Sequence, residues 1–190
     1  FDFKISLGSL IKFFYKEIIN PEESLIEFNH KNKIELENKI DFSKKNIGLV
    51  WSGSFLGPNE PYRSIPLNNF RKILSLNANF YALQNEVWER DLEYFKSSNL
   101  IDCGNYKLDE LSSLISKLDL VITCDTSLLH LASSLNIETW GILCLYPDWR
   151  WGEFNKFNPY NKLKLFNQKK FCNWDFIYDE IYELLEKKLN

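Results

Sequence analysis

The chain has 190 residues, of which 45% are hydrophobic and 16% aromatic, and its formal net charge is −3 at pH 7. This composition supports a well-packed core and argues against disorder, and the absence of any long basic run argues against nucleic acid or an anionic membrane as a partner. No apolar stretch approaches the roughly 18–20 residues that a membrane-spanning helix needs.

Residues 1–45 differ in pattern from the rest of the chain. The stretch FDFKISLGSLIKFFYKEII predicts a helical arm, and NHKNKIELENKIDFSKK predicts a polar linker. The chain begins at Phe1 and contains no methionine, so we expect that an upstream part has been removed. We therefore predict that residues 1–45 lead from a missing N-terminal domain and that residues 46–190 form one α/β domain.

From residue 46 onward, strand patterns alternate with helix patterns. The strand runs are almost continuously apolar, which is typical of parallel strands buried on both faces. Strands are expected at residues 46–53, 79–84, 100–104, 119–124, 138–146 and 162–168, and helices at 66–76, 86–98, 108–118, 127–135 and 173–190. Residues expected to face the core from the helices include Leu92, Leu108, Leu111, Ile177 and Ile181. The alternation predicts a Rossmann-like, doubly wound parallel sheet of about six strands.

The junction CDTSLLHLA joins the expected fourth strand to a helix at the ligand-binding edge of such a sheet. The first N–H groups of that helix, including those of Ser127 and Leu128, predict an anion site suited to phosphate. The hydroxyls of Thr126 and Ser127 add donors, whereas Asp125 would repel phosphate and is expected to accept bonds from sugar hydroxyls. The alternative is an ordinary helix capped by Asp125 or Thr126.

Other residues at the same edge carry both a functional and a structural interpretation. Arg63 can donate to a pyrophosphate or lie solvated on the surface, and Gln84 can bind a base or ribose. Glu86 is expected to open the next helix. His130 can contact a phosphate or hydroxyl, or be half-buried against a backbone carbonyl. The long loop after the first strand brings Ser52, Gly53 and Ser54 to this edge.

Two further residue classes lead to structural expectations. The large aromatic residues Trp149, Trp151 and Tyr160 either cover the core or wall a pocket, and the core interpretation is favoured. The four cysteines lack CxxC spacing, so they predict reduced, buried thiols and a cytoplasmic location. They are Cys103, Cys124, Cys144 and Cys172. No DxD, HExxH or GxSxG pattern occurs, so we expect no metal and no cofactor.

Several segments together resemble the C-terminal half of family-9-like glycosyltransferases, which are relatives of the bacterial heptosyltransferases. They are GLVWSGS, RSIPLNNF, YALQ, LDLVITCDTSLLHLASSL, TWGIL, PDWRWG and YNKLKLFNQ, in that order. The likeness is greatest to the branch often fused behind tetratricopeptide repeats, and it covers nearly the whole chain. It implies a GT-B arrangement, in which two Rossmann-like domains face a cleft and the C-terminal one binds a nucleoside-diphosphate sugar without metal.

Carried over to this sequence, the resemblance implies a set of donor-binding residues. They are Ser52, Gly53, Ser54, Arg63, Gln84, Asp125, Thr126, Ser127, Leu128 and His130. The general base is expected in the missing N-terminal domain, so the isolated chain would bind a donor without transferring its sugar. The acceptor would be a glycan, a lipid-linked precursor or a protein. The alternatives are a non-catalytic binding or scaffolding module and an unrelated doubly wound domain.

Overall fold

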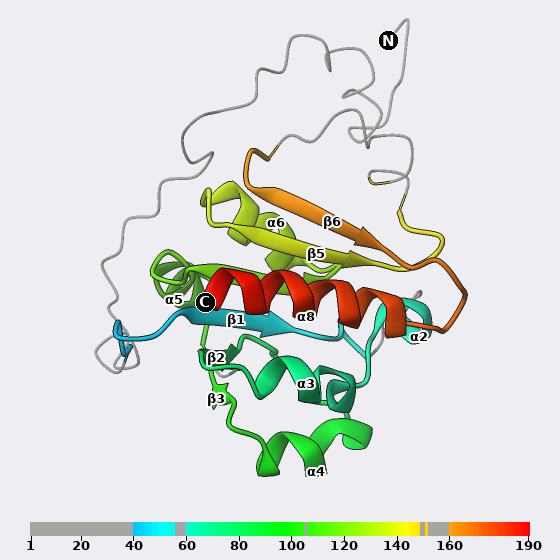
Figure 1. Cartoon of the computed structure of the whole chain (residues 1–190), viewed down its shortest axis with the longest axis horizontal. Helices are drawn as coiled ribbons and strands as arrows, with labels where there is room; N and C mark the ends of the chain where they lie inside the picture. Colours follow the sequence, from blue (N-terminus) through cyan, green and yellow to red (C-terminus); the bar gives the residue numbers. More distant parts are fainter. Residues whose placement is uncertain (1–39, 56–59, 105, 149–150, 152–159) are drawn as a thin grey trace, which may run out of the picture.

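The computed structural model describes residues 40–55, 60–104, 106–148, 151 and 160–190. The strands in this part of the chain are β1 (Asn46–Val50), β2 (Asn79–Ala82), β3 (Ile101–Asp102), β4 (Leu120–Cys124), β5 (Thr139–Leu143) and β6 (Leu163–Asn167). They form one parallel sheet in the order β3-β2-β1-β4-β5-β6 (Figure 1). This is the Rossmann strand order, and it reverses direction between β1 and β4. The predicted fold class is confirmed.

The helices follow the predicted alternation. They are α2 (Glu60–Arg63), η2 (Leu67–Phe70), α3 (Arg71–Leu74), α4 (Glu89–Ser97), α5 (Leu108–Ile115), α6 (Ser127–Ser134) and α8 (Asp175–Leu189). The helix expected at 66–76 is divided into a 3₁₀ turn and a short α-helix. The predicted helical arm falls outside the described residues, and the domain boundary at residue 45 stays a prediction.

Helices cover both faces of the sheet. One core cluster packs α3 and α8 against one face and includes Ile47, Leu49 and Ile181. The other face packs against α5 and α6 through Val50 and Leu83. Figure 1 shows α8 lying along the front of the sheet with α6 behind it. Because each fully buried aliphatic side chain contributes about 1.5–3 kcal/mol, these two layers hold the strand ends in fixed positions.

Two predicted core residues are exposed, and a charged residue is buried instead. Leu92 in α4 and Leu108 in α5 are exposed at 37% and 55%. The inward position on α4 belongs to Asp91, which accepts hydrogen bonds from Trp51 Nε1 at 3.1 Å and from the Leu67 backbone N–H at 2.9 Å. The prediction for Leu92 is wrong because these two buried donors require an acceptor, which a leucine cannot supply.

At the amino ends of the strands, Asp119 joins β1 to β4. Its carboxylate accepts hydrogen bonds from Lys45 Nζ at 2.6 Å and from the Asn46 backbone N–H at 2.9 Å. Burial raises the pKa of Asp119, but these bonds and the lysine charge together outweigh it, so the pKa lies below its ordinary value. The folded state therefore favours the ionised carboxylate.

All four cysteines are free, as predicted, but only Cys103 and Cys124 are buried. Burial, with a smaller contribution from Asp102, raises the pKa of Cys103 to about 12. Cys144 is partly buried, and Cys172 is exposed in the turn between β6 and α8, so the prediction of burial is wrong for the latter. Within the described ranges, no helix is long and apolar enough to cross a membrane.

Candidate functional site

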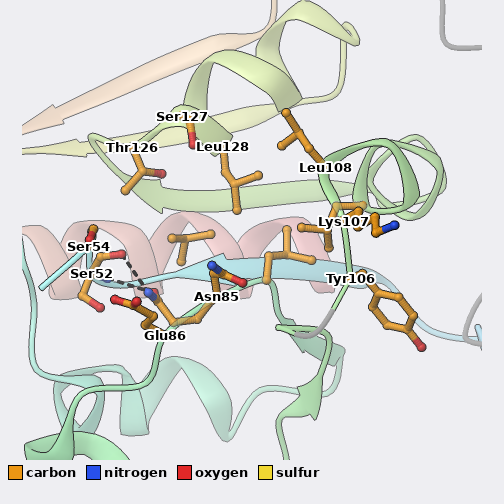
Figure 2. Close-up of a pocket in the computed structure, with 15 residues that line it drawn as sticks. Ser52, Ser54, Asn85, Glu86, Tyr106, Lys107, Leu108, Thr126, Ser127 and Leu128 are labelled. Atoms are coloured by element: carbon orange, nitrogen blue, oxygen red, sulfur yellow. Dashed lines mark hydrogen bonds between the residues drawn. The ribbon is translucent and has the colours of Figure 1, made fainter.

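A cavity of about 590 Å³ opens at the carboxyl edge of the sheet, where the strand order reverses between β1 and β4. Its walls come from the segments that follow β1, β2, β3 and β4. Figure 2 shows Ser52, Ser54 and Glu86 on one side and Thr126, Ser127 and Leu128 on the other. Ligands of open α/β sheets bind at this type of switch point, so the cavity is the candidate functional site.

The wall after β1 is built around Ser52, which is buried and immobilised by Gln84. Gln84 Oε1 accepts hydrogen bonds from the Trp51 and Ser52 backbone N–H groups at 3.2 and 3.1 Å, and Gln84 Nε2 donates to the Ser52 carbonyl at 2.9 Å. In the described part of the chain, the Ser52 hydroxyl has no hydrogen-bond partner. A buried hydroxyl without a partner is costly, and Ser52 is one of the residues that line the cavity.

The loop that follows Ser52 is anchored where the structure describes it. Gly53 donates its N–H to Ser64 Oγ at 3.3 Å, and its carbonyl accepts from Trp88 Nε1 at 3.3 Å. The Ile65 N–H returns to the Trp51 carbonyl at 2.8 Å. These bonds hold Gly53 and the exposed Ser54 at the cavity, as the sequence predicted.

The opposite wall is the N-terminus of α6. Thr126 is its N-cap residue, with φ −133° and ψ 173°, and no side chain in the described structure caps the helix. The Thr126 hydroxyl instead lies 3.2 Å from the Thr123 hydroxyl. The alternative of an ordinary side-chain cap from Asp125 or Thr126 is therefore wrong. The helix dipole and the first N–H groups are available to an anion at this wall.

Arg63 is fixed beside this helix terminus. Its Nη1 donates a hydrogen bond to the Asp125 carbonyl at 2.9 Å, immediately before the N-cap of α6. Neither Arg63 nor Asp125 lines the cavity. The structure thus brings the Arg63 guanidinium to the N-terminus of α6. One N–H group of that guanidinium is already bonded to the backbone.

The surroundings of His130 differ from the donor-binding position that the resemblance implied. Its Nδ1 lies 3.0 Å from the Tyr160 hydroxyl, and its ring stacks on Trp151 with centroids 5.0 Å apart and an interplanar angle of 19°. Trp151 is buried with Leu129, Leu143 and Leu163, so its core interpretation is confirmed. One partner of His130 is thus the Tyr160 hydroxyl, and His130 does not line the cavity.

Seven of the ten predicted site residues line the cavity, and eight further lining residues had not been assigned to it. Three of these are the apolar residues Val50, Leu83 and Leu111, and the other five are Asn85, Glu86, Tyr106, Lys107 and Leu108. Their position after β2 and β3 was the available signal, because the carboxyl ends of parallel strands share one edge. Glu86 was expected in a helix and Leu108 in the core. However, α4 begins only at residue 89, and Leu108 is the exposed first residue of α5.

In the ranges that the structure describes, no group of three or more His, Cys, Asp or Glu side chains could hold a metal ion. The six-stranded parallel sheet, its strand order and the cavity at the switch point define a Rossmann-like domain of the class that binds ligands at this edge.

The family follows from comparison with known proteins. The model of glycosyltransferase family 9 (heptosyltransferase) matches residues 73–171, which is more than half of the 190-residue chain. The chain belongs to glycosyltransferase family 9, and the predicted resemblance is confirmed. The association with tetratricopeptide repeats stays a prediction. No curated protein matches the chain.

Solved structures agree on the fold. Escherichia coli ADP-heptose LPS heptosyltransferase II is 14% identical, with a TM-score of 0.56 over 97% of this chain and 53% of that one. E. coli heptosyltransferase WaaC with ADP is 10% identical, with a TM-score of 0.57 over 80% and 47%. A family 9 glycosyltransferase from Veillonella parvula is 16% identical, with a TM-score of 0.51 over 80% and 41%. The chain thus spans about half the length of these proteins or less.

Proposed function

We propose that this chain is the donor-binding half of a glycosyltransferase and that its cavity holds a nucleoside-diphosphate sugar. The observation that carries this proposal is the pair of polar groups on opposite walls of the cavity (Figure 2). Ser52, whose buried hydroxyl has no partner in the described structure, lines one wall, and the N-terminus of α6, which lacks a side-chain cap, forms the other. A diphosphate between them would accept bonds from both walls.

The remaining lining residues suit a nucleoside. Leu83, Leu108 and Leu128 supply apolar surface on which a base can pack. Glu86 follows β2, where an acidic residue of a Rossmann-like fold accepts bonds from ribose hydroxyls. We therefore propose that the nucleoside extends from α6 toward the β3 side of the cavity, with the diphosphate at α6.

The same geometry supports transfer chemistry without metal. Breaking the bond from sugar to diphosphate leaves negative charge on the departing phosphate oxygen. The N-terminus of α6 and the Arg63 guanidinium would stabilise that charge electrostatically. Asp125 would accept bonds from the sugar hydroxyls. The general base and the acceptor site are proposed to lie outside the described residues, and the acceptor is proposed to be a bacterial glycan or its precursor.

The proposal is tested by removing one backbone donor from α6. Ser127 is the first helical residue, where proline is tolerated, and Thr126 before it has the extended backbone that proline requires. Ser127→Pro should therefore fold while lacking one N–H at the phosphate site. We expect it to weaken binding of ADP, UDP or GDP, whichever binds the wild type, by about tenfold. Isothermal titration calorimetry measures this, with and without EDTA.

Ser127→Ala is the matched control, because it removes the exposed hydroxyl and keeps the N–H group. Equal affinity of Ser127→Pro and wild type, with the fold intact by circular dichroism, would contradict a diphosphate at α6. Loss of binding in EDTA would contradict a site that works without metal. If none of the three diphosphates binds the wild type, the proposed function fails.

A further inference from the structure

Two half-exposed aromatic side chains pack against each other at the carboxyl edge of the sheet. Tyr62 in α2 and Phe171 in the turn after β6 have ring centroids 5.4 Å apart at an interplanar angle of 39°. They remain 50% and 56% exposed. Neither belongs to a core cluster in the described structure, so they form a small exposed apolar surface, which we call the aromatic ledge.

The ledge is connected to the N-terminus of α6. Tyr62 directly precedes Arg63, and the Arg63 guanidinium donates to the Asp125 carbonyl at 2.9 Å. On the other side, the Leu145 N–H donates to Gln168 Oε1 at 3.0 Å and ties the end of β5 to the turn that carries Phe171. The segments that carry the two rings are thus tied to the residue before α6 and to the end of β5.

The strand order places the ledge and the cavity on opposite sides of the proposed phosphate position. The cavity extends from the end of β4 toward β1, β2 and β3. The turn carrying Phe171 follows β6, which lies on the other side of β4 in the strand order of the sheet. A ligand whose nucleoside fills the cavity and whose diphosphate meets α6 would direct its next group away from β3, toward the ledge.

We propose that the aromatic ledge of Tyr62 and Phe171 binds the sugar ring of the donor. This inference rests on the proposed function, because it needs a nucleoside diphosphate in the cavity. One face of a pyranose presents C–H groups that can pack on an aromatic ring, and an aromatic surface beside polar groups is typical of a binding site. Asp125, whose backbone carbonyl accepts the bond from Arg63, is the residue proposed to accept bonds from the sugar hydroxyls.

The test compares each nucleotide with its own sugar nucleotide. The probes are ADP with ADP-glucose, UDP with UDP-glucose and GDP with GDP-mannose. We expect Tyr62→Ala and Phe171→Ala to weaken binding of the sugar nucleotide about three- to tenfold. The affinity for the nucleoside diphosphate should be unchanged. Tyr62→Phe keeps the aromatic ring and should bind like the wild type. Phe42→Ala is the matched control, because Phe42 is exposed but precedes β1 at the opposite edge.

The outcomes separate the ledge from the proposed function. If a diphosphate and its sugar nucleotide are weakened equally, the ledge acts through Arg63 or the fold and the inference is overturned. Unchanged binding of both ligands in both alanine variants also overturns it, while the proposed function stands. If the wild type binds none of the six probes, the proposed function fails and the ledge fails with it. A loss confined to the sugar nucleotide, restored by Tyr62→Phe, supports the inference.

Discussion

Asp91 offers the sharpest test of how the protein builds its cavity. Its carboxylate is buried and accepts bonds from Trp51 Nε1 and from the Leu67 backbone N–H, at 3.1 and 2.9 Å. Trp51 immediately precedes Ser52, and Leu67 begins the 3₁₀ helix after the loop. Asp91 therefore holds both ends of the loop that supplies one wall of the cavity. We expect Asp91→Ala to destabilise the fold strongly and to weaken nucleotide binding.

The magnitude follows from the two buried donors that alanine would leave without an acceptor. Each unsatisfied buried donor costs about 1–3 kcal/mol, so together they cost about 2–6 kcal/mol. Loss of a negative charge near the N-terminus of α4 adds about 0.3–1 kcal/mol. Asp91→Asn keeps one acceptor of nearly the same shape, so its cost should be about half that of Asp91→Ala.

Urea unfolding followed by circular dichroism measures these differences through the shift of the transition midpoint. The matched control is Glu89→Ala, because Glu89 lies in the same first helical turn but is exposed. Glu89→Ala should lower the free energy of unfolding by only about 0.3–1 kcal/mol, as expected for losing a negative charge at the N-terminus of α4. The reasoning is refuted if the free energies of unfolding of Asp91→Ala and Glu89→Ala differ by less than about 1 kcal/mol. Two buried donors without an acceptor should destabilise the protein by more than that.

Three further predictions concern the surroundings of the site. Gly104→Ala should lower the melting temperature and cost about 1–3 kcal/mol, because a Cβ there would lie 2.3 Å from the Gln84 carbonyl oxygen; no change would contradict this contact. Asp119→Asn should cost about 1 kcal/mol at pH 7. Because the pKa of Asp119 is lowered in the folded state, that difference in urea unfolding should disappear as the pH falls below about 4, and a constant difference would refute it. Iodoacetamide at pH 8 should modify exposed Cys172 and spare native Cys103, whose pKa is raised to about 12; mass spectrometry of the peptides would reveal any reaction at Cys103.

The sequence predicted the elements well because its strands are continuous apolar runs. β1 and β4 are buried at every position, and each precedes a polar segment at the carboxyl edge. The junction at Thr126 was therefore located correctly. The sequence did not decide whether a side chain caps this helix, because a capped and an uncapped helix can have the same residues. In the folded chain, the Thr126 hydroxyl lies 3.2 Å from the Thr123 hydroxyl and does not cap the helix.

Long-range pairing explains what the sequence could not predict. Gln84 looked like a ligand-binding residue, yet both atoms of its amide bond to the backbone of residues 51 and 52. Asp91 was not singled out in the sequence, yet it is buried and accepts bonds from Trp51 and Leu67, which lie far from it along the chain. His130 was placed near the phosphate, and its partners Trp151 and Tyr160 come from beyond β5. Such partners depend on the fold and leave no local pattern.

The helix termini explain why one junction suits an anion better than the others. Four described helices have eight or more residues, and three of them, α4, α5 and α8, have acidic residues in their first turn. In α5, Glu110 also accepts a bond from the Lys107 N–H at 2.7 Å. α6 has neither an acidic first turn nor a side-chain cap. Acidic side chains stabilise a helix N-terminus but repel a phosphate. Without them, α6 lacks that stabilisation but leaves room for an anion. We interpret the lack of an acidic first turn in α6 as a feature of a ligand site. A bound anion would supply at α6 the negative charge that acidic side chains supply at the other three helices.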